Sequence, residues 1–254
     1  MENKEIVKQD AQVPATIAQM DEFQPYSVDD TIKLPRLILA QGGRNNQIIK
    51  DDLAKDGELV NSLSKENYGK EIEIIPLLQK KSSRIRWKAR TEGGGILCIA
   101  RDGEHGQGDP GDSIDGNLCS KCPYFQVRKG QGQADDKWCS QNYEIIALVR
   151  ASKEPIILAA DSIKPADAGI RDMLGMARLN ANKGYRMYQK SYILRVKDAE
   201  ANGYNFFKLA CVPGNSNLPL PQEEFEFMLS QSNFFKGSHI EADIESKEGD
   251  VAPW

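Results

Sequence analysis

The apolar residues of this chain gather in short runs bounded by turn residues, and most of the runs are rich in β-branched or alternating residues. Such runs predict β-strands. The predicted strands cover residues 32–40, 71–78, 84–90, 96–100, 143–149, 155–160, 185–196 and 204–212. Turns near residues 152–154 and at Asn202-Gly203 would join the last two pairs as hairpins.

Helical periodicity is found in two places. Ser162, Pro165 or Asp167 could open a helix that ends near Asn180, and Asn182 and Gly184 follow it. Its apolar face consists of Ile170, Met173, Leu174, Ala177 and Leu179. Residues 222–235 (QEEFEFMLSQSNFF) predict a second, short amphipathic helix. Residues 44–70 read as a connection in which residues 57–62 form a short strand or a turn.

These elements predict a mainly β fold of the β-rich α+β class, a small barrel or sandwich with one or two short helices. Residues 1–30 are polar and predict a disordered acidic arm. The expected domain covers residues 31–221, followed by a helix at 222–236 and a disordered acidic tail at 237–254. No glycine-rich nucleotide-binding motif is present.

Charge is distributed unevenly. The chain of 254 residues has a net charge of −4, but residues 1–30 carry −5 and residues 222–254 carry −6. The middle, residues 31–221, holds 29 bases and 22 acids, a net charge of +7. An acidic-basic-acidic chain fits a central domain that binds a polyanion and ends that compete for the same surface.

Four cysteines suggest a metal site. Cys98, Cys119, Cys122 and Cys139 are separated by 20, 2 and 16 residues, so a C-x2-C pair has one further cysteine on each side. Two such thiolates point to one place, and two more complete a tetrahedral site for structural Zn2+. The polar loop at 102–117 has five glycines and four aspartates, and a metal would hold it in place. We therefore expect a zinc-binding insertion at 98–139.

Other uses of these cysteines fit the sequence less well. The N-terminal residues have no apolar segment typical of a secretory signal, which argues against disulfides. The flanking sequence lacks the strand-helix pattern of a thioredoxin-type redox motif. Four cysteines would leave no ligand position open for catalysis. His105 could replace one cysteine as a ligand, and Cys211 reads as a small buried apolar residue.

A basic strand is the first candidate for nucleic-acid binding. Residues 80–90 (KKSSRIRWKAR) contain six bases in eleven positions. Period-two alternation puts Arg84, Arg86, Lys88 and Arg90 on one face and Trp87 on the other. Four bases without an acid on one strand face would repel one another unless an anion is bound, although a solvated sheet face is the alternative.

A second candidate lies between residues 185 and 206. A strand there would put Arg186, Tyr188, Lys190 and Tyr192 on one face, with Arg195 and Lys197 further along and Tyr204 and Phe206 across the hairpin. Single-stranded nucleic acid is bound by bases that stack on aromatic rings and by Lys and Arg on phosphates. Tyrosines half-buried in a sheet are the alternative interpretation.

The last residues form the third candidate. Acids are spaced along the tail and precede Val251-Ala252-Pro253-Trp254. A chain end with an apolar anchor and a carboxylate suits a basic pocket with an apolar floor. The expected partner-binding residues are Glu245, Glu248, Asp250, Pro253 and Trp254.

This tail resembles that of bacterial single-stranded DNA-binding proteins, which end in Phe, and of phage-encoded replication proteins with the same role. Pro35-Arg36-Leu37, the basic-aromatic run Arg84-Ile85-Arg86-Trp87 and the inserted cysteines resemble phage single-stranded DNA-binding proteins with an OB-fold. The resemblance implies an OB-fold-like barrel, binding of single-stranded DNA, and recruitment of replication and recombination proteins through the tail.

The expectation is therefore a non-enzymatic, phage or mobile-element protein that coats single-stranded DNA in replication or recombination. A zinc-ribbon adaptor between proteins and an RNA-binding protein are the alternatives. No apolar run is long enough to span a bilayer, so we expect a cytoplasmic protein without a membrane partner. The sequence leaves open whether it forms a homo-oligomer.

Overall fold

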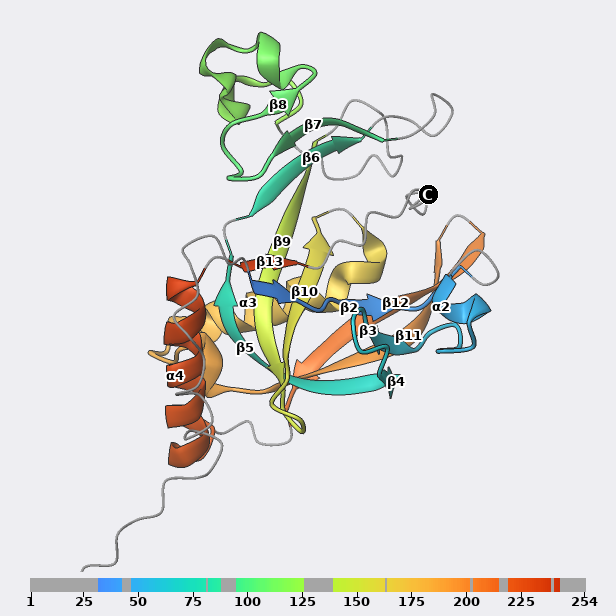
Figure 1. The fold of residues 1–254 in the computed structure, drawn as a ribbon, viewed down its shortest axis with the longest axis vertical. Coiled ribbons are helices and arrows are strands. Elements are labelled where there is room, and N and C mark those ends of the chain that lie inside the picture. The colour runs from blue at the N-terminus through green and yellow to red at the C-terminus, as the bar shows by residue number, and fades with distance from the viewer. Residues whose placement is uncertain are drawn as a thin grey trace, which may run out of the picture.

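The structure, a computed structural model, describes residues 32–42, 47–80, 82–87, 95–125, 139–162, 164–201, 203–214, 219–238 and 240–242. It is mainly β (Figure 1). The strands are β1 (Ile32–Leu34), β2 (Leu37–Leu39), β3 (Leu59–Asn61), β4 (Asn67–Gly69), β5 (Glu71–Gln79), β6 (Ser83–Trp87), β7 (Ile96–Ala100), β8 (Gln107–Gly108), β9 (Cys139–Val149), β10 (Pro155–Asp161), β11 (Tyr192–Ala201), β12 (Tyr204–Pro213) and β13 (Ile240–Ala242). The helices are α2 (Gln47–Lys50), α3 (Ala168–Ala181) and α4 (Gln222–Gly237), with 3-10 turns at Gly111–Ser113, Asp115–Asn117, Cys119–Lys121, Pro165–Asp167 and Met187–Gln189.

The long strand β9 organises the main sheet. On one edge it pairs with β10, and on the other it pairs first with β6 and then with β5. The full order on one side of β9 is β12-β11-β5, and β7 and β8 continue outward from β6. If β5, β9, β10 and β11 are numbered 1 to 4 along the chain, their order across the sheet is 4-1-2-3. This order is a Greek key. The sheets formed by the described residues are open and do not close into a barrel.

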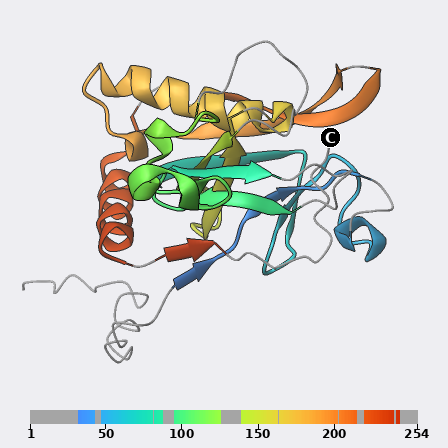
Figure 2. The same ribbon diagram turned by 90° about the horizontal axis from the view of Figure 1, so that it is seen from above.

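Both faces of the sheet centre are buried, which explains why its strands read as continuous apolar runs. Ile145 and Ala147 of β9 face one core, whereas Ile146 and Leu148 face the other. Figure 2 shows the layers on each side, with α3 on one side and the β1–β13 pair on the opposite side.

Helix α3 packs into the first core through Ile170, Met173 and Leu174 and contacts both β10 and β12. It therefore lies against β10 and β12, the strands at the two ends of the order β12-β11-β5-β9-β10. The second core is covered by α4, which inserts Met228 and Phe235, and by the parallel pair β1–β13. A small sheet, β2-β3-β4, packs with α2 beside this body.

Much of the predicted pattern is confirmed. The mainly β class, the strands at 71–78 and 96–100, the hairpin of β9 and β10, the helix after Asp167 and the helix that begins at Gln222 are all present. The predicted strand at 32–40 is split into β1 and β2 at Pro35-Arg36, and residues 44–70 contain α2, β3 and β4. No helix in the described ranges is long and apolar enough to cross a bilayer.

Two predictions were wrong. Residues 185–191 form a loop with a 3-10 turn, and β11 begins only at Tyr192. The tail does not begin at 237, because Ile240 is buried and pairs with Ile32 in β13. Residues 240–242 are therefore part of the fold, although the polar composition of this segment predicts disorder. Residues 1–31 and 243–254, the arm and most of the tail, lie outside the described residues.

Candidate metal centre and nucleic-acid interface

Strands β6, β7 and β9 bring the outer two cysteines together. Arg86 of β6 is opposite Cys98 of β7 on one side and opposite Cys139 of β9 on the other. Directly paired residues of an antiparallel sheet point to the same face. Cys98, Arg86 and Cys139 therefore stand in a row on one face of this three-stranded part of the sheet.

The inner two cysteines come from the loop that covers this face. Cys119 begins a 3-10 turn and Cys122 follows it, with the Cys122 amide donating to the Cys119 carbonyl at 2.9 Å. Backbone hydrogen bonds hold the loop, including Gly106 N–H to Asn117 O at 2.8 Å and Cys119 N–H to Glu104 O at 2.7 Å.

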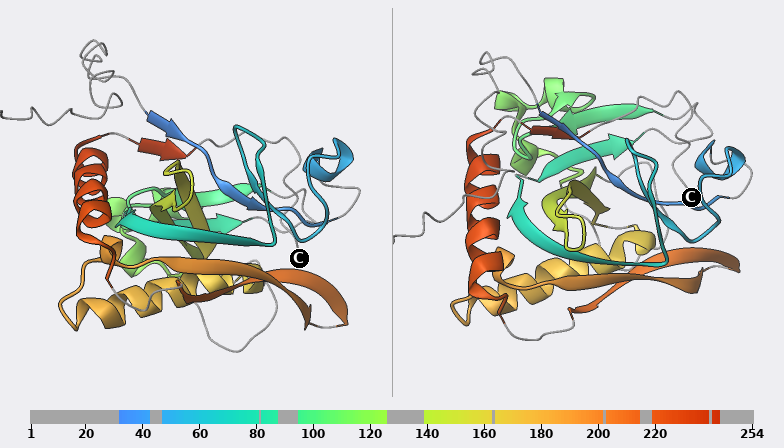
Figure 3. Two further views of the ribbon diagram at one scale, coloured as in Figure 1. Left: turned by 90° about the horizontal axis from the view of Figure 1, so that it is seen from below. Right: turned by 60° about the horizontal axis from the view of Figure 1, so that its bottom comes forward.

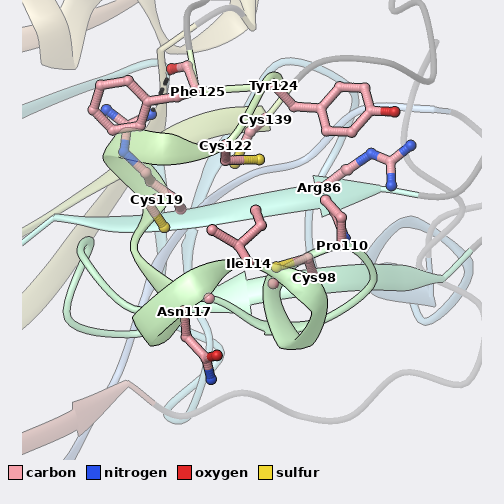
Figure 4. A pocket seen from close by; sticks show the side chains of 13 residues that line it. Arg86, Cys98, Pro110, Ile114, Asn117, Cys119, Cys122, Tyr124, Phe125 and Cys139 are labelled. Atoms are coloured by element: carbon pink, nitrogen blue, oxygen red, sulfur yellow. Dashed lines mark hydrogen bonds between the residues drawn. The ribbon is translucent and has the colours of Figure 1, made fainter.

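All four cysteines line one cavity (Figure 4). Its volume of about 20 Å³ has room for one water-sized particle. Gly106 and Gly111 close it, because a Cβ on Gly106 would lie 3.0 Å from Cys98 Sγ and 3.8 Å from Cys119 Sγ. A Cβ on Gly111 would lie 2.9 Å from Cys98 Sγ. The backbone of the loop thus packs closely against the thiols of Cys98 and Cys119.

The donor set fits a soft or borderline metal ion such as Zn2+, which four thiolates bind tetrahedrally at about 2.3 Å. No three of the four sulfurs lie within 4.8 Å of one another, since the one such group found among the described residues is Asp102, Glu104 and His105. The sulfurs of a tetrahedral site would be about 3.8 Å apart. Binding would therefore draw the loop cysteines toward the strands.

The pKa values of three of the cysteine thiols in the cavity are raised. Burial raises the pKa of the Cys98 and Cys119 thiols and raises the pKa of Cys139 to about 11. The other thiolates add to each shift, while the charges of Arg84 and Arg86 oppose it. A metal ion would bind in place of the thiol protons.

His105 is not part of this cavity. Its Nδ1 lies 2.6 Å from Asp102 Oδ2, and its side chain is half exposed. Asp102 Oδ1 also accepts the amides of Glu104 and His105, and these bonds hold the pKa of Asp102 well below its usual range. The arrangement is a solvent-facing turn, so it does not favour His105 as a substitute for a cysteine.

The basic side chains of Arg84 and Arg86 on β6, part of the predicted cationic strand, line the cavity of the four cysteines. The guanidinium of Arg84 lies 4.0 Å from the centroid of the Phe125 ring, and that of Arg86 lies 4.0 Å from the centroid of the Tyr124 ring. Trp87 is the last residue of β6, and Lys88 and Arg90 fall outside the described residues. The face of β6 that was expected to bind a polyanion is thus covered at Arg84 and Arg86 by Tyr124 and Phe125.

The second predicted set is dispersed. Tyr192 is 2% exposed, belongs to the first core and accepts a hydrogen bond from Asn180 Nδ2 at 3.1 Å. Tyr188 lies in a 3-10 turn, is buried, and stacks on Phe225. The prediction that these two rings stack bases was wrong for this structure, because the core covers them. Arg186 is exposed, and Lys190 lies over the Tyr185 ring.

The outer face of the β11–β12 hairpin carries basic and aromatic side chains, the mixture that the sequence predicts for binding of single-stranded nucleic acid. This hairpin face consists of Arg195, Lys197, Ala199, Tyr204, Phe206, Lys208 and Ala210. Residues opposite each other in the hairpin include Lys197 and Lys208, and Ala199 and Phe206. The next residues along each strand, such as Leu194 and Leu209, point into the core. Figure 3 shows the hairpin running along one side of the molecule, with its tip at the same end as α2.

Exposure suits this hairpin face to a ligand. Tyr204 is 67% exposed, Lys197 is exposed, and Phe206 and Lys208 are partly exposed. Arg195 pairs with Glu71 of β5 at 2.5 Å. Sequence reasoning had singled out Arg195, Lys197, Tyr204 and Phe206 but missed Lys208, which continues the period-two pattern of Tyr204 and Phe206.

The residues expected to bind partners, Glu245, Glu248, Asp250, Pro253 and Trp254, lie outside the described residues. A family model described as Pam3 phage gp34-like protein matches residues 8–240 of the chain. No curated protein matches the chain, and no solved structure matches it either.

Proposed function

The chain belongs to the Pam3 phage gp34-like protein family, and from this premise we propose that it is a phage protein that binds single-stranded DNA. The proposed binding surface is the hairpin face, with Lys197 and Lys208 on phosphates and Tyr204 and Phe206 under bases. Coating of DNA during replication or recombination is the role that this activity would serve. No part of the proposal requires catalysis.

One observation supports this proposal most strongly: Lys197 and Lys208 are directly opposite each other. Like charges in that position destabilise a hairpin, and an anion bound between them would remove the repulsion. The residue opposite Phe206 is Ala199, and its small side chain leaves room beside the Phe206 ring. Stacking on exposed rings and phosphate contacts are how proteins bind single strands without sequence preference.

The strand order supports an OB-like relationship as part of the same proposal. An OB-fold is a five-stranded, partly open Greek-key barrel, and the loops between its strands 1 and 2 and between 4 and 5 contribute to oligonucleotide binding. If β5, β9, β10, β11 and β12 are these five strands, the cysteine-bearing insertion is the first loop. The tip of the β11–β12 hairpin is then the second.

Zinc has a structural role in this proposal. Cys98, Cys119, Cys122 and Cys139 would hold the ion, which would fasten the loop at 101–122 to β6, β7 and β9. The ion would supply cross-linking, since four protein ligands leave no open position for a substrate.

The test is a titration of labelled oligo-dT with the wild type and with a Lys197→Gln/Lys208→Gln double variant. We expect affinity to fall about tenfold or more at low salt, and the slope of log K against log salt to decrease by about 1.4, the value for two phosphate contacts on a single strand. A double variant of the exposed Lys33→Gln and Lys236→Gln is the matched control, because it loses the same charge on β1 and α4.

Equal losses in both double variants, or equal affinity for a matched duplex and for oligo-dT, would contradict the proposal. Equal binding of oligo-U would widen the ligand to single-stranded RNA. A zinc-ribbon adaptor between proteins is the second candidate. It is favoured because Arg84 and Arg86 pack on the Phe125 and Tyr124 rings of the cysteine-bearing insertion. Absence of oligonucleotide binding by the wild type would favour it.

A further inference from the structure

Two arginines stand among the metal-ligating cysteines on the same sheet face. Arg86 is opposite both Cys98 and Cys139 in the strand register. Arg84, two residues earlier on β6, points to the same face because side chains alternate along a strand. Both arginines line the cavity that the four cysteines share.

Contacts hold Arg86 in place and keep it from solvent. Its side chain is only 12% exposed, its guanidinium lies over the Tyr124 ring, and Nη1 donates to the Asp109 carbonyl at 3.2 Å. Figure 4 shows Tyr124 and Arg86 side by side at the edge of the cavity. Within the described residues the buried Nε has no hydrogen-bond partner. A cysteine thiolate of the metal centre is the kind of acceptor that would satisfy this Nε–H group.

Arg84 is held in the same manner from the other side. Its guanidinium lies over the Phe125 ring and donates to the Phe125 carbonyl at 3.1 Å. Tyr124 and Phe125 follow Cys122-Pro123 directly, so the two arginines hold the segment that leaves the second loop cysteine. Each arginine thereby fixes the C-x2-C turn relative to the strand cysteines.

Charge makes the arrangement costly unless an anionic group is present. Buried cations need partners, and the one carboxylate paired with either arginine in the described ranges is Asp109, at 3.6 Å and with its side chain 78% exposed. Four thiolates around a divalent ion carry a formal charge of about −2. Two guanidinium groups beside the cavity would neutralise that charge.

We propose that Arg84 and Arg86 are charge-compensating and positioning residues of the metal centre, and that they do not contact DNA. The inference rests on the proposed metal site and deepens it. It reassigns the basic strand from phosphate binding, since Arg86 would have to leave the Tyr124 ring and its buried position to reach a phosphate.

The experiment measures metal affinity in Arg84→Gln, Arg86→Gln and Arg86→Lys, with Arg178→Gln on the exposed face of α3 as the control. A chromophoric chelator competes for Zn2+, and Co2+ substitution reports the number of thiolate ligands by its sulfur-to-metal absorption. The affinity of each variant for oligo-dT is measured at saturating Zn2+.

We expect Arg86→Gln to lose about 10- to 100-fold in zinc affinity, as for other residues that support metal ligands. Its cobalt spectrum should keep the four-thiolate signature. Arg86→Lys should recover part of the affinity, because it keeps the charge without the planar stacking. Oligo-dT affinity at saturating Zn2+ should stay within about twofold of the wild type.

Zinc affinity equal to that of Arg178→Gln in both glutamine variants would overturn the inference, as would weaker oligo-dT binding at saturating Zn2+. A wild type that binds no Zn2+ would instead contradict the metal site itself. If Arg86→Gln does not fold, Arg86→Lys decides, because unchanged zinc affinity and weaker DNA binding in that variant would also overturn the inference.

Discussion

Gly169 allows the backbone of α3 to approach β12 closely. A Cβ at this position would lie 2.7 Å from the carbonyl carbon of Leu209 and 2.8 Å from the amide nitrogen of Ala210. Backbone atoms in a sheet cannot shift as easily as a flexible side chain. The contact matters because α3 lies against both β10 and β12.

We predict that Gly169→Ala destabilises the protein by about 2–3 kcal/mol through overpacking. Gly175→Ala is the matched control on the same helix, since nothing lies within 4 Å of a Cβ there. It should stabilise by about 0.5–1 kcal/mol, the helix preference of alanine over glycine. Urea unfolding measures both, and equal effects at the two positions would show that α3 can move away from β12.

Burial separates the roles of two tyrosines. We predict that Tyr192→Phe lowers the free energy of unfolding by about 1 kcal/mol, because it removes the hydrogen bond with Asn180, and leaves oligo-dT affinity unchanged. Tyr204→Ala should have the opposite pattern, with stability almost unchanged and binding weakened by about 1–3 kcal/mol through lost stacking. Thermal unfolding and anisotropy titration of both variants would distinguish the roles.

At the scale of elements, ion pairs attach α4 to the turn after β9. Glu224 accepts from Arg150 at 3.0 Å and from Lys153 at 2.7 Å, and Arg150 also pairs with Glu73 of β5 at 2.8 Å. Burial alone would raise the pKa of Glu224, but the hydrogen bonds from Arg150 and Lys153 outweigh it and hold the pKa below its usual value.

This shift gives a pH prediction. Because the folded pKa of Glu224 is lowered, its contribution is complete above the unfolded pKa, about 4.5, and is lost as the pH falls through the folded value. Glu224→Gln should cost about 1–2 kcal/mol at pH 7, and the difference from the wild type should shrink below that unfolded pKa. Unfolding at several pH values tests this, with the exposed Glu223→Gln as a control that should change little.

Sequence patterns located most strands, because continuous apolar runs signal a sheet covered on both faces. They also identified the four cysteines that meet at one cavity. They could not tell which side of β6 is covered, because Tyr124 and Phe125 pack on Arg84 and Arg86 only after the loop turns back at Cys122. In the same way, alternation around Tyr188 suggested a strand, whereas packing against Phe225 of α4 favours a 3-10 turn.

At the scale of the whole molecule, the acidic residues beyond β13 are expected to compete with DNA for the hairpin face. We predict that deleting residues 243–254 tightens oligo-dT binding about two- to fivefold at low salt, with the difference vanishing as salt screens the charges. The deletion must keep β13. Removing residues 237–254 would also expose the core around Ile240 and should lower the free energy of unfolding, which serves as the comparison.

An unchanged or weaker affinity after deletion of 243–254 would contradict competition by the tail. The wild type and the deletion variant should have equal thermal stability if the effect is purely electrostatic. A lower stability in the deletion variant would mean that these residues contribute to folding instead.

The parallel pairing of β1 with β13 has a consequence for electrostatic repulsion. Residues 1–31 carry a net charge of −5 and residues 243–254 a net charge of −3, and the two segments attach to neighbouring strands at Ile32 and Ala242. The two strands run in the same direction, with Ile32 opposite Ile240 and Leu34 opposite Ala242, so the two acidic segments attach at opposite ends of the pair. Added salt should therefore change the β1–β13 pairing little, while it weakens contacts of the hairpin face with DNA.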